Sequence, residues 1–403
     1  MQRLYNIFIS VFIFGMKLGA VFNYKLKRGL AGRRKACSEL KARISPEDRV
    51  IWMHAASLGE YEQGLPVLER LKSEFPGHKI LITFFSPSGY ENVVKRKHIA
   101  DVVAYLPFDL PQWVEEFTAN FHADIFFTVK YDYWYNLLDA LKRRGTKIYV
   151  VSAYFYETQL FFKAYGGWFA QQLKKNVDWF FHQTRQSTAL AKGIGLKQSS
   201  TSGDTRFDRV KKQLETDNTV PIIEEFITDK LTVVFGSSWE AEEHIAEILT
   251  SKNKSVNIII APHDLKRVDH LKKIFPTAVL YSELEEIARR YCENCGEDLS
   301  NAKIPAHEMP LSQVLIVDCI GLLGKLYSYA DVAVVGGGFH SAGLHNILEA
   351  AVFGIPVVFG NQYKEKPEAD ALISAGGAKA FEDEFFAGNY IVGLLKQPEI
   401  LSK

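Results

Sequence analysis

The sequence predicts an α/β protein with two doubly wound halves, each built on a parallel sheet. Apolar runs of the length of buried strands alternate with helical patterns through both halves, which is the order that βαβ units produce. The chain has 403 residues, more than one hydrophobic core usually serves, so two domains are expected. A glycine-rich loop between two apolar runs, within residues 332–360, gives the strand–loop–helix–strand order of such a half.

Composition narrows the functional class. Hydrophobic residues make up 47% of the chain and charged residues 24%, which is ordinary for a globular protein. The net charge is +1 and no basic stripe is interleaved with aromatic residues, so nucleic acid is not an expected partner. Cys292 and Cys295 form a CxxC pair without a second pair at zinc spacing, so no metal is predicted. Four cysteines without a disulfide pattern indicate a reducing compartment.

The N-terminal segment, residues 1–34, is predicted to be a hydrophobic anchor with a basic flank. Residues 5–22 are mostly apolar, are interrupted by Lys17, and reach the lower limit of a membrane span. An interfacial helix and a helix of the first core are the alternatives. The basic residues that follow are Lys25, Lys27, Arg28, Arg33, Arg34 and Lys35. They predict that the rest of the protein lies on the cytoplasmic side of the membrane.

The first half, residues 35–215, contains strands with polar loops at their carboxyl ends. The predicted strands are residues 50–53, 80–84, 102–106, 125–129, 147–152, 180–182 and 198–202. Polar or glycine residues follow at 54–60, 86–89, 130–136 and 203–208. Ligands bind at this edge of open α/β sheets, so these loops are candidate site loops.

Aromatic residues are dense at 154–169, and two interpretations stay open for this segment. It is either a helix packed into the first domain or a surface for acyl chains or the bilayer interface.

The second half, residues 216–385, repeats the pattern and precedes a helical tail at 386–403. The predicted strands are residues 231–235, 256–261, 314–317, 332–335 and 356–359. No GxGxxG with an acidic partner and no GxxxxGK[ST] is present, so a dinucleotide enzyme and a P-loop ATPase are disfavoured.

The glycine loop suits a nucleotide. Gly336, Gly337 and Gly338 precede a helix predicted over residues 345–353, so backbone N–H groups and a helix N-terminus are expected to point at a phosphate. Asn346 and Glu349 would share one helix face, where the carboxylate can accept hydrogen bonds from ribose hydroxyls. The alternative is a plain strand-to-helix turn.

Five blocks in order resemble the 3-deoxy-D-manno-octulosonic acid (Kdo) transferases of lipopolysaccharide biosynthesis, glycosyltransferase family 30. The blocks are residues 54–60 (His-Ala-Ala-Ser-Leu-Gly-Glu), 86–89 (Ser-Pro-Ser-Gly), 203–208 (Gly-Asp-Thr-Arg-Phe-Asp), 261–263 (Ala-Pro-His) and 336–349. The resemblance implies a GT-B fold. In that fold two Rossmann-like domains, one that binds the acceptor and one that binds the CMP-sugar, face a central cleft. An N-terminal membrane-anchor helix precedes the first domain in the sequence.

The sequence departs from the family pattern at four positions. Lys130 replaces the first glutamate of the family's E-T-E-x-W-P-N, and Arg206 replaces the lysine of G-N-L-K-F-D. His263 stands for the arginine of A-P-R-H, and Leu322 stands for a glutamate after Gly321. An acidic role at position 130 therefore does not carry over.

The resemblance implies an inverting, metal-independent transfer of Kdo from CMP-Kdo to the lipid A precursor lipid IVA, without a cofactor. Glu60, expected to face the cleft, would be the general base, while Arg206 would bind the phosphate or the donor carboxylate and Lys130 an acceptor phosphate. Expected acceptor contacts are Ser57, Gly59, Ser86, Ser88 and Gly89. Expected CMP contacts are Pro262, His263, Ile320, Gly321, Leu322, Gly336, Gly337, Gly338, Asn346, Ile347, Leu348 and Glu349.

Two other functions remain open from the sequence. One is another GT-B sugar-nucleotide enzyme, a UDP-sugar transferase or a 2-epimerase. The other is a membrane-tethered nucleotide-binding module without catalysis, in which Glu60 would be dispensable. The oligomeric state is not predicted.

Overall fold

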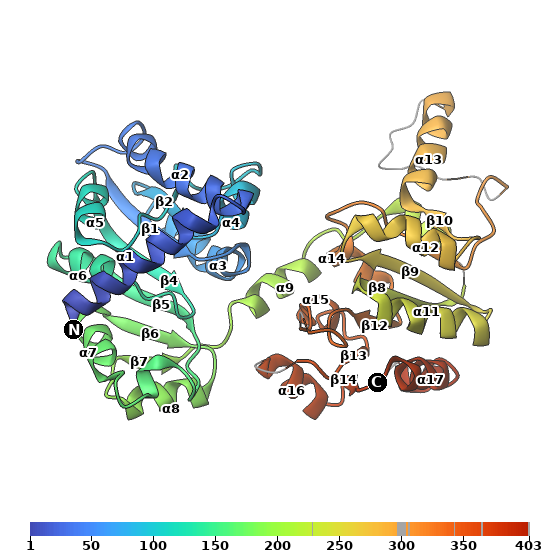
Figure 1. Cartoon of the computed structure of the whole chain (residues 1–403). Coiled ribbons are helices and arrows are strands. Elements are labelled where there is room, and N and C mark those ends of the chain that lie inside the picture. Colours follow the sequence, from blue (N-terminus) through green and yellow to red (C-terminus); the bar gives the residue numbers. More distant parts are fainter. Residues whose placement is uncertain (228, 296–303, 305–306, 342, 364–365, 402–403) are drawn as a thin grey trace. The chain divides into compact units, whose positions relative to one another are not determined.

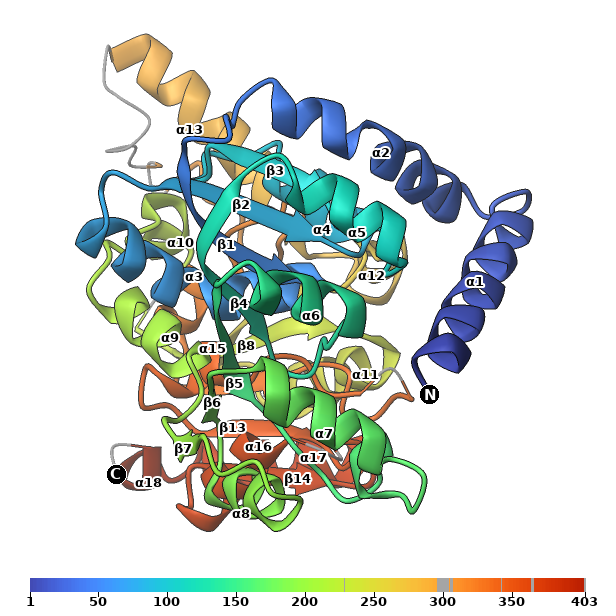
Figure 2. The same cartoon turned by 90° about the vertical axis from the view of Figure 1, so that its left-hand side faces the viewer.

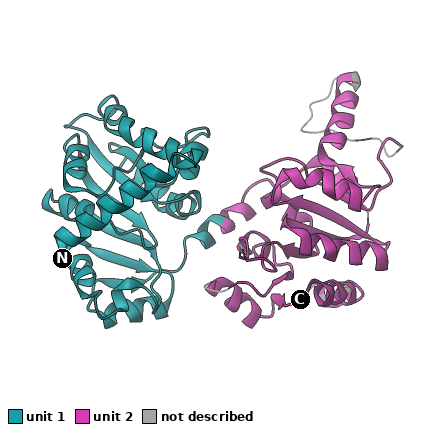
Figure 3. Cartoon of the chain, in the orientation of Figure 1, with its two compact units in different colours: residues 1–209 teal, residues 210–403 magenta. Residues whose placement is uncertain are grey.

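A computed structural model of the chain describes all residues except 228, 296–303, 305–306, 342, 364–365 and 402–403 (Figure 1). The chain divides into unit 1, Met1–Arg209, and unit 2, Val210–Lys403 (Figure 3). Each unit contains one parallel sheet with helices against it, so the predicted α/β class is confirmed.

The sheet of unit 1 has seven strands in the order β3-β2-β1-β4-β5-β6-β7. They are β1 (Arg49–Ala55), β2 (Lys79–Phe84), β3 (Val102–Tyr105), β4 (His122–Val129), β5 (Lys147–Ala153), β6 (Trp179–His182) and β7 (Ser199–Thr201). The strand order reverses between β1 and β4, where Met53 pairs with Phe127 and His54 with Thr128. Such a switch point is where open α/β sheets bind ligands.

Helices cover both faces of this sheet. They are α1 (Gln2–Gly19), α2 (Tyr24–Lys41), α3 (Leu58–Glu74), α4 (Pro87–Val93), α5 (Pro111–Thr118), α6 (Tyr135–Arg143), α7 (Gly167–Asn176) and α8 (Arg185–Gly193). Helix α9 (Arg206–Leu214) instead runs from unit 1 into unit 2. Successive strand residues face opposite cores, so Trp52 packs on Phe126 on one face while Met53 packs with Phe127 on the other.

The aromatic segment 154–169 is not the continuous helix that one interpretation predicted. It forms an irregular connection with one 3-10 turn, Leu160–Phe162, before α7 starts at Gly167. Phe155 is buried, and Phe161 packs against it with ring centroids 5.6 Å apart. Much of this aromatic density therefore belongs to the core of unit 1.

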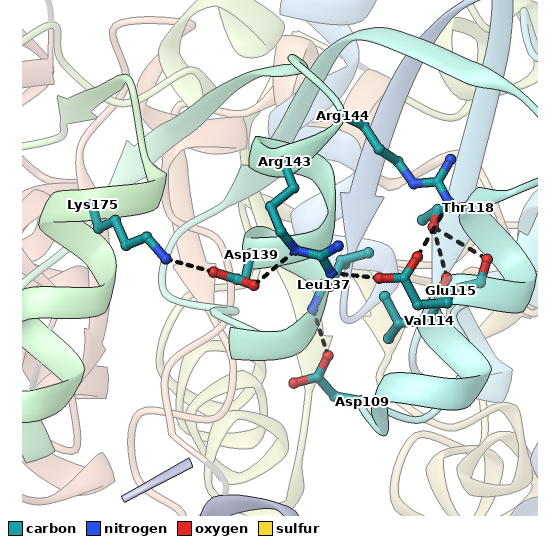
Figure 4. Close-up of polar contacts among 9 residues, drawn as sticks. All are labelled: Asp109, Val114, Glu115, Thr118, Leu137, Asp139, Arg143, Arg144 and Lys175. Carbon is teal, nitrogen blue, oxygen red and sulfur yellow. Dashed lines mark hydrogen bonds and ion pairs between the residues drawn. The ribbon is translucent and has the colours of Figure 1, made fainter.

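Ion pairs join α5, α6 and α7 at the surface (Figure 4). Asp139 of α6 pairs with Lys175 of α7 at 2.9 Å and with Arg143 at 3.2 Å. Arg143 also pairs with Glu115 of α5. Each exposed ion pair of this kind contributes little to the free energy of unfolding. The pairs connect neighbouring helices at the surface of unit 1.

Helix α1 has one face on unit 1 and an opposite face that is exposed. Ile9 and Ile13 are buried beside Phe108, and the Tyr5 hydroxyl donates to Asp109 Oδ2 at 2.6 Å. The same carboxylate accepts from the Leu137 N–H, at 2.8 Å, at the start of α6 (Figure 4). The exposed apolar side chains of α1 are Leu4, Ile7, Phe8, Val11, Phe12, Phe14 and Leu18. No helix in the described part of the chain has both the length and the apolar character needed to cross a membrane.

Helix α2 follows α1 after a short turn and lies beside β3 (Figure 2). Asn23 starts it by accepting from the N–H groups of Lys25 and Leu26. A short polar side chain at this position satisfies helix N–H groups that have no partner within the helix.

The sheet of unit 2 has seven strands in the order β10-β11-β9-β8-β12-β13-β14. They are β8 (Leu231–Ser238), β9 (Val256–Pro262), β10 (Val279–Leu280), β11 (Val314–Ile316), β12 (Val332–Val335), β13 (Val357–Gly360) and β14 (Ala378–Phe381). The helices are α10 (Pro221–Phe226), α11 (Glu240–Lys252), α12 (Val268–Ile274), α13 (Tyr281–Cys295), α14 (Leu323–Leu326), α15 (Leu348–Ala351), α16 (Pro367–Ser374), α17 (Glu384–Leu394) and α18 (Pro398–Leu401). Here the switch point lies between β8 and β12.

Candidate active site

Glu60 is fixed at the carboxyl end of β1 by the local sequence. Ser57 starts α3 and Glu60 is three residues further, so the two form a capping box. Glu60 Oε2 accepts from the N–H groups of Ala56, at 2.6 Å, and Ser57, at 3.1 Å. Among the described contacts Oε1 accepts none, so this oxygen is available to a ligand.

The environment of Glu60 favours its protonated form. The side chain is 8% exposed, and burial raises the pKa of its carboxyl. The charge of Asp132 raises the pKa further. The hydrogen bond from the Ala56 N–H and the charge of the Lys130 ammonium lower this pKa. Glu60 therefore combines a raised pKa with a fixed position, as a general base requires.

A buried histidine–aspartate pair lies beside Glu60. His54, at the end of β1, is fully buried, and its Nε2 lies 2.5 Å from Asp132 Oδ2. Its Nδ1 lies 3.0 Å from Thr83 Oγ1 on β2. No role was predicted for His54 from the sequence. Its place at a strand end next to the loop after β4 was the signal that could have identified the pair.

Lys130 directly follows β4 and has a strained backbone conformation. Its φ is 63°, which is unusual for a residue other than glycine, and such strain is concentrated at functional sites. Its backbone is held on both sides, by N–H donation to the Val151 carbonyl at 3.0 Å and by a hydrogen bond from the Tyr133 hydroxyl to its own carbonyl at 2.8 Å. Its lowering effect on the Glu60 pKa places the ammonium near that carboxylate.

Arg206 is paired within unit 1. Its Nε donates to Asp204 Oδ2 at 2.7 Å, and Gln63 donates to Asp204 Oδ1 at 3.0 Å. Gln63 lies one turn beyond Glu60 on α3, so the segment that carries Arg206 is attached to the helix of the predicted base. A role for Arg206 toward phosphate stays a prediction.

The predicted acceptor residues meet at the same edge. Ser86 starts α4, and its N–H donates to the Ala56 carbonyl at 2.9 Å, next to Ser57. The Ser86 and Ser88 hydroxyls are 2.8 Å apart. Gly89 has a packing reason, because a Cβ there would lie 2.5 Å from the Phe84 ring. Gly59, at the start of α3, has space for a Cβ.

Unit 2 has a cavity of about 710 Å³ at the carboxyl ends of β8, β9 and β11. Its lining includes four of the predicted donor contacts, Pro262, His263, Ile320 and Gly321. Leu322 is not in the lining and packs on the core instead, whereas Leu323 lines the cavity. The volume lies within the range usual for small-molecule sites.

Trp239 and His263 line this cavity, and two further histidines contact their rings from outside the lining. The Trp239 ring stacks on His263, with centroids 4.6 Å apart, and on His340, at 4.9 Å. Trp239 Nε1 donates to His345 Nε2 at 3.4 Å, and burial lowers the pKa of His345 to about 4. His345 is therefore neutral at physiological pH. The sequence analysis missed Trp239 and His340, because their stacking joins segments about a hundred residues apart.

The glycine loop differs from the prediction. Gly336 N–H donates to the Gly236 carbonyl at 2.9 Å, and Gly337 N–H donates to Glu242 Oε1 at 3.1 Å. These two N–H groups are used inside the protein, which corrects the expectation that they point at a phosphate. A Cβ on Gly338 would lie 2.6 Å from the Gly360 nitrogen, so close backbone packing explains that glycine.

The helix predicted over residues 345–353 is limited to one turn, α15. The N–H groups of Leu344 and His345 bond to the Gln362 and Gly336 carbonyls, and the first helical hydrogen bonds run from the Ala350 and Ala351 N–H groups to the Ile347 carbonyl. Asn346 Nδ2 still donates to Glu349 Oε1 at 3.0 Å, which keeps this predicted pair together.

The side chains of two other predicted donor contacts are buried. Ile347 and Leu348, at the start of α15, lie in the apolar core of unit 2 or at its edge. Only their backbone groups remain as candidates for contact with a donor.

No described group of three or more His, Cys, Asp or Glu side chains is placed to hold a metal ion. The Cys292 side chain is buried in the core of unit 2. The side chain of Cys295 lies outside the described part of the structure. The metal-free expectation therefore stays a prediction.

Known proteins resemble this chain over most of its length. Residues 28–209 match the sequence profile of the 3-Deoxy-D-manno-octulosonic-acid transferase (kdotransferase) family. The 3-deoxy-D-manno-octulosonic acid transferase of Aquifex aeolicus is 27% identical over 311 residues, 77% of this chain and 75% of that protein. The enzyme of the same description from Chlamydophila psittaci is 24% identical over 87% of this chain and 78% of its own.

A solved structure supports the fold. UDP-GlcNAc 2-epimerase from Neisseria meningitidis, bound to UDP-GlcNAc, aligns with a TM-score of 0.57 at 17% identity, covering 88% of this chain and 93% of that one. At this identity the likeness concerns the fold alone.

Proposed function

Because this chain belongs to the Kdo transferase family, we propose that it transfers Kdo from CMP-Kdo to the lipid A precursor lipid IVA with inversion. The observation that carries the proposal is the buried Glu60 carboxylate, fixed at the switch point of unit 1 with its Oε1 available. An acceptor hydroxyl needs a base of this kind when it attacks the anomeric carbon.

The reaction is a single displacement. The acceptor oxygen bonds to the anomeric carbon of Kdo and its proton passes to Glu60 Oε1. The bond from that carbon to the phosphate oxygen breaks, and CMP leaves with the electron pair. Burial, and next the charge of Asp132, which His54 holds, keep the pKa of Glu60 raised so that the carboxylate accepts the proton. Lys130 supplies a positive charge near the attacking group.

The donor binds in the cavity of unit 2. Its volume of about 710 Å³ suits a nucleotide, and the rings of Trp239 and His263 offer flat surfaces for a base or a sugar. Glu349, held by Asn346, accepts hydrogen bonds from the ribose hydroxyls.

Helix α1 attaches the protein to the cytoplasmic face of the inner membrane. Its exposed apolar face is followed by the exposed basic residues of α2, a combination that favours the surface of an anionic bilayer. Replacing Phe8 and Phe14 by serine should abolish flotation with phosphatidylglycerol vesicles. The matched control replaces Phe385 and Phe386, which are equally exposed on α17 of unit 2. Equal loss in both variants would contradict the assignment.

The activity is tested by incubating the protein with CMP-Kdo and lipid IVA and then measuring the mass of the lipid by mass spectrometry. The expected result is a lipid heavier by one or more Kdo residues. Parallel reactions with UDP-sugars should leave the lipid unchanged. Transfer from a UDP-sugar, or epimerisation of UDP-GlcNAc, would overturn the proposal in favour of another sugar-nucleotide enzyme.

A further inference from the structure

A second cavity, of about 260 Å³, lies in unit 1 away from the site described above. It is enclosed by α1, α2 and the segment that leads from β3 into α5. Its lining combines cationic and apolar side chains, among them Lys17, Arg33, Arg34, Cys37, Phe108 and Trp113.

The charge in this cavity is unbalanced. Lys17, Arg33 and Arg34 contribute three cations, and Glu116 is the single carboxylate of the lining. Within the described part of the chain, no ion pair of these cations is found. Cations gathered without a counter-charge attract an anion.

Arg33 is the buried one of the three cations in this cavity. Its side chain is buried, with 8% exposure, although it has no carboxylate partner in the described structure. One terminal nitrogen donates to the Phe85 carbonyl at 2.6 Å and the other to the Gly29 carbonyl at 3.1 Å, while Nε has no hydrogen-bond partner. The guanidinium also lies 4.7 Å from the Phe108 ring centroid. Burial lowers the pKa of Arg33 to about 10, so it remains charged at physiological pH.

A buried arginine without a bound anion lowers the stability of the folded protein. Buried charges are normally paired, because removing them from water is unfavourable. The aromatic contacts and carbonyls around Arg33 offset part of that cost and leave the net charge in place. A bound anion in the adjacent cavity would neutralise it.

The apolar part of the lining restricts the ligand further. Leu30, Phe108 and Trp113 border the same space, and the exposed apolar face of α1 belongs to the helix that supplies Lys17. A water molecule takes about 30 Å³, so the cavity holds a phosphate and a short apolar segment rather than a whole lipid.

We propose that this cavity binds the phosphate end of an anionic lipid, with the phosphate on Lys17, Arg33 and Arg34 and the adjoining carbons against Phe108 and Trp113. The same chemistry has two sources, a phospholipid of the bilayer and a phosphate of the lipid acceptor. Only the second source rests on the proposed function.

The test uses Cys37, whose thiol lines the cavity. Alkylation of Cys37 by N-ethylmaleimide is followed by mass spectrometry of its peptide in the full-length protein, with and without lipid. The probes are dihexanoyl phosphatidylglycerol for the bilayer source and detergent-dispersed lipid IVA for the acceptor source. At ten times the dissociation constant, alkylation should slow about tenfold, because only the free cavity reacts. Dihexanoyl phosphatidylcholine, which has no net charge, should give little protection.

The variant pair decides whether protection arises in the cavity. Lys17→Ala with Arg34→Ala removes two exposed cations of the lining and should abolish protection. Lys25→Ala with Lys27→Ala removes two exposed cations of α2 outside the lining and should preserve it. Equal protection in both variants, or none in the unaltered protein, would overturn the proposal.

The choice of lipid identifies the source. Protection by phosphatidylglycerol indicates the bilayer, and protection by lipid IVA alone indicates an acceptor subsite. Kdo transfer is measured on the same samples. Transfer without protection overturns this inference alone, whereas protection without transfer overturns the proposed function alone.

Discussion

The two switch points of this chain are built on the same topology but carry different chemistry. In unit 1 the edge between β1 and β4 holds ionisable groups, the buried Glu60 and His54 and the partly exposed Asp132. In unit 2 the cavity beside β8 is bordered by stacked rings, with Trp239 between two imidazole contacts. One edge is suited to moving a proton and the other to holding a flat ligand. A shared fold therefore leaves the chemistry to the loop residues.

The largest effect that tests this difference between the two units is expected from Glu60→Gln. If the switch point of unit 1 moves the proton, this substitution should lower turnover without weakening donor binding in unit 2. Glutamine keeps the capping box but cannot take a proton. Turnover at saturating lipid should fall by about 10²–10⁴-fold, while CMP-Kdo affinity is unchanged. Saturation curves in lipid acceptor measure this.

The matched control is Glu62→Gln on the same helix, where the carboxylate pairs with Arg96 and Arg209 at the surface. Near-normal turnover in Glu60→Gln would show that the carboxylate only caps α3. An increased Michaelis constant with normal turnover would instead indicate acceptor binding.

The next effect belongs to unit 2. Glu349→Ala removes the carboxylate that Asn346 holds, and CMP binding should weaken by about 10–150-fold, since hydrogen bonds to a charged group contribute about 1.5–3 kcal/mol. Calorimetric titration with CMP gives the affinity. Unchanged affinity together with a lower Tm would mean that Glu349 serves only the fold.

Unit 2 also contains a buried carboxyl, Glu242, although we assign ligand binding rather than proton transfer to this unit. We expect Glu242 to affect the stability of the fold. Burial raises its pKa from 4.5 to about 6, although N–H groups of Trp239 and Gly337 favour the charged form. Its protonated form stabilises the fold below pH 4.5, and about 2 kcal/mol of that contribution is lost as the pH rises through about 6. Unfolding by urea between pH 4 and 7 should show this loss in the unaltered protein and not in Glu242→Gln. Parallel pH profiles would contradict the assignment.

The smallest expected effect is on the pH profile of Asp132→Asn. The pKa of Glu60 is raised mainly by burial and next by the charge of Asp132, so removing that charge lowers it. The acidic limb of kcat/KM should therefore move to lower pH. A limb that stays in place or moves to higher pH would show that Asp132 does not act on the base.

Local signals predicted the backbone well where one segment decides the structure. The apolar runs predicted the buried strands, whereas the capping box of Ser57 and Glu60 that starts α3 was not recognised from the sequence. The helix expected at residues 345–353 is limited to α15, and the Leu344 and His345 N–H groups before it bond to carbonyls that are distant in the sequence. Sequence periodicity does not report such partners.

The site shows the same limit. The family resemblance pointed to Glu60, whose role as base stays a prediction, whereas His54 and Asp132 meet only because β1 and β4 are neighbours in the folded sheet. Gly336 and Gly337 have the appearance of a phosphate loop in sequence, but their N–H groups are used by Gly236 and Glu242. Which partner takes a backbone group is decided by tertiary packing.

The Tyr5–Asp109 contact has a practical consequence for anyone who shortens this protein to make it easier to purify. Asp109 is almost fully buried, and one of its hydrogen-bond donors is the Tyr5 hydroxyl of α1. The same carboxylate holds the start of α6, where the Asn136 N–H donates to it at 2.9 Å. Removing α1 would take away that donor and open the carboxylate to solvent, at the end of the loop that carries Lys130 and Asp132. A truncated protein would therefore differ from the full chain in the loop that carries Lys130 and Asp132 as well as in its exposed apolar surface.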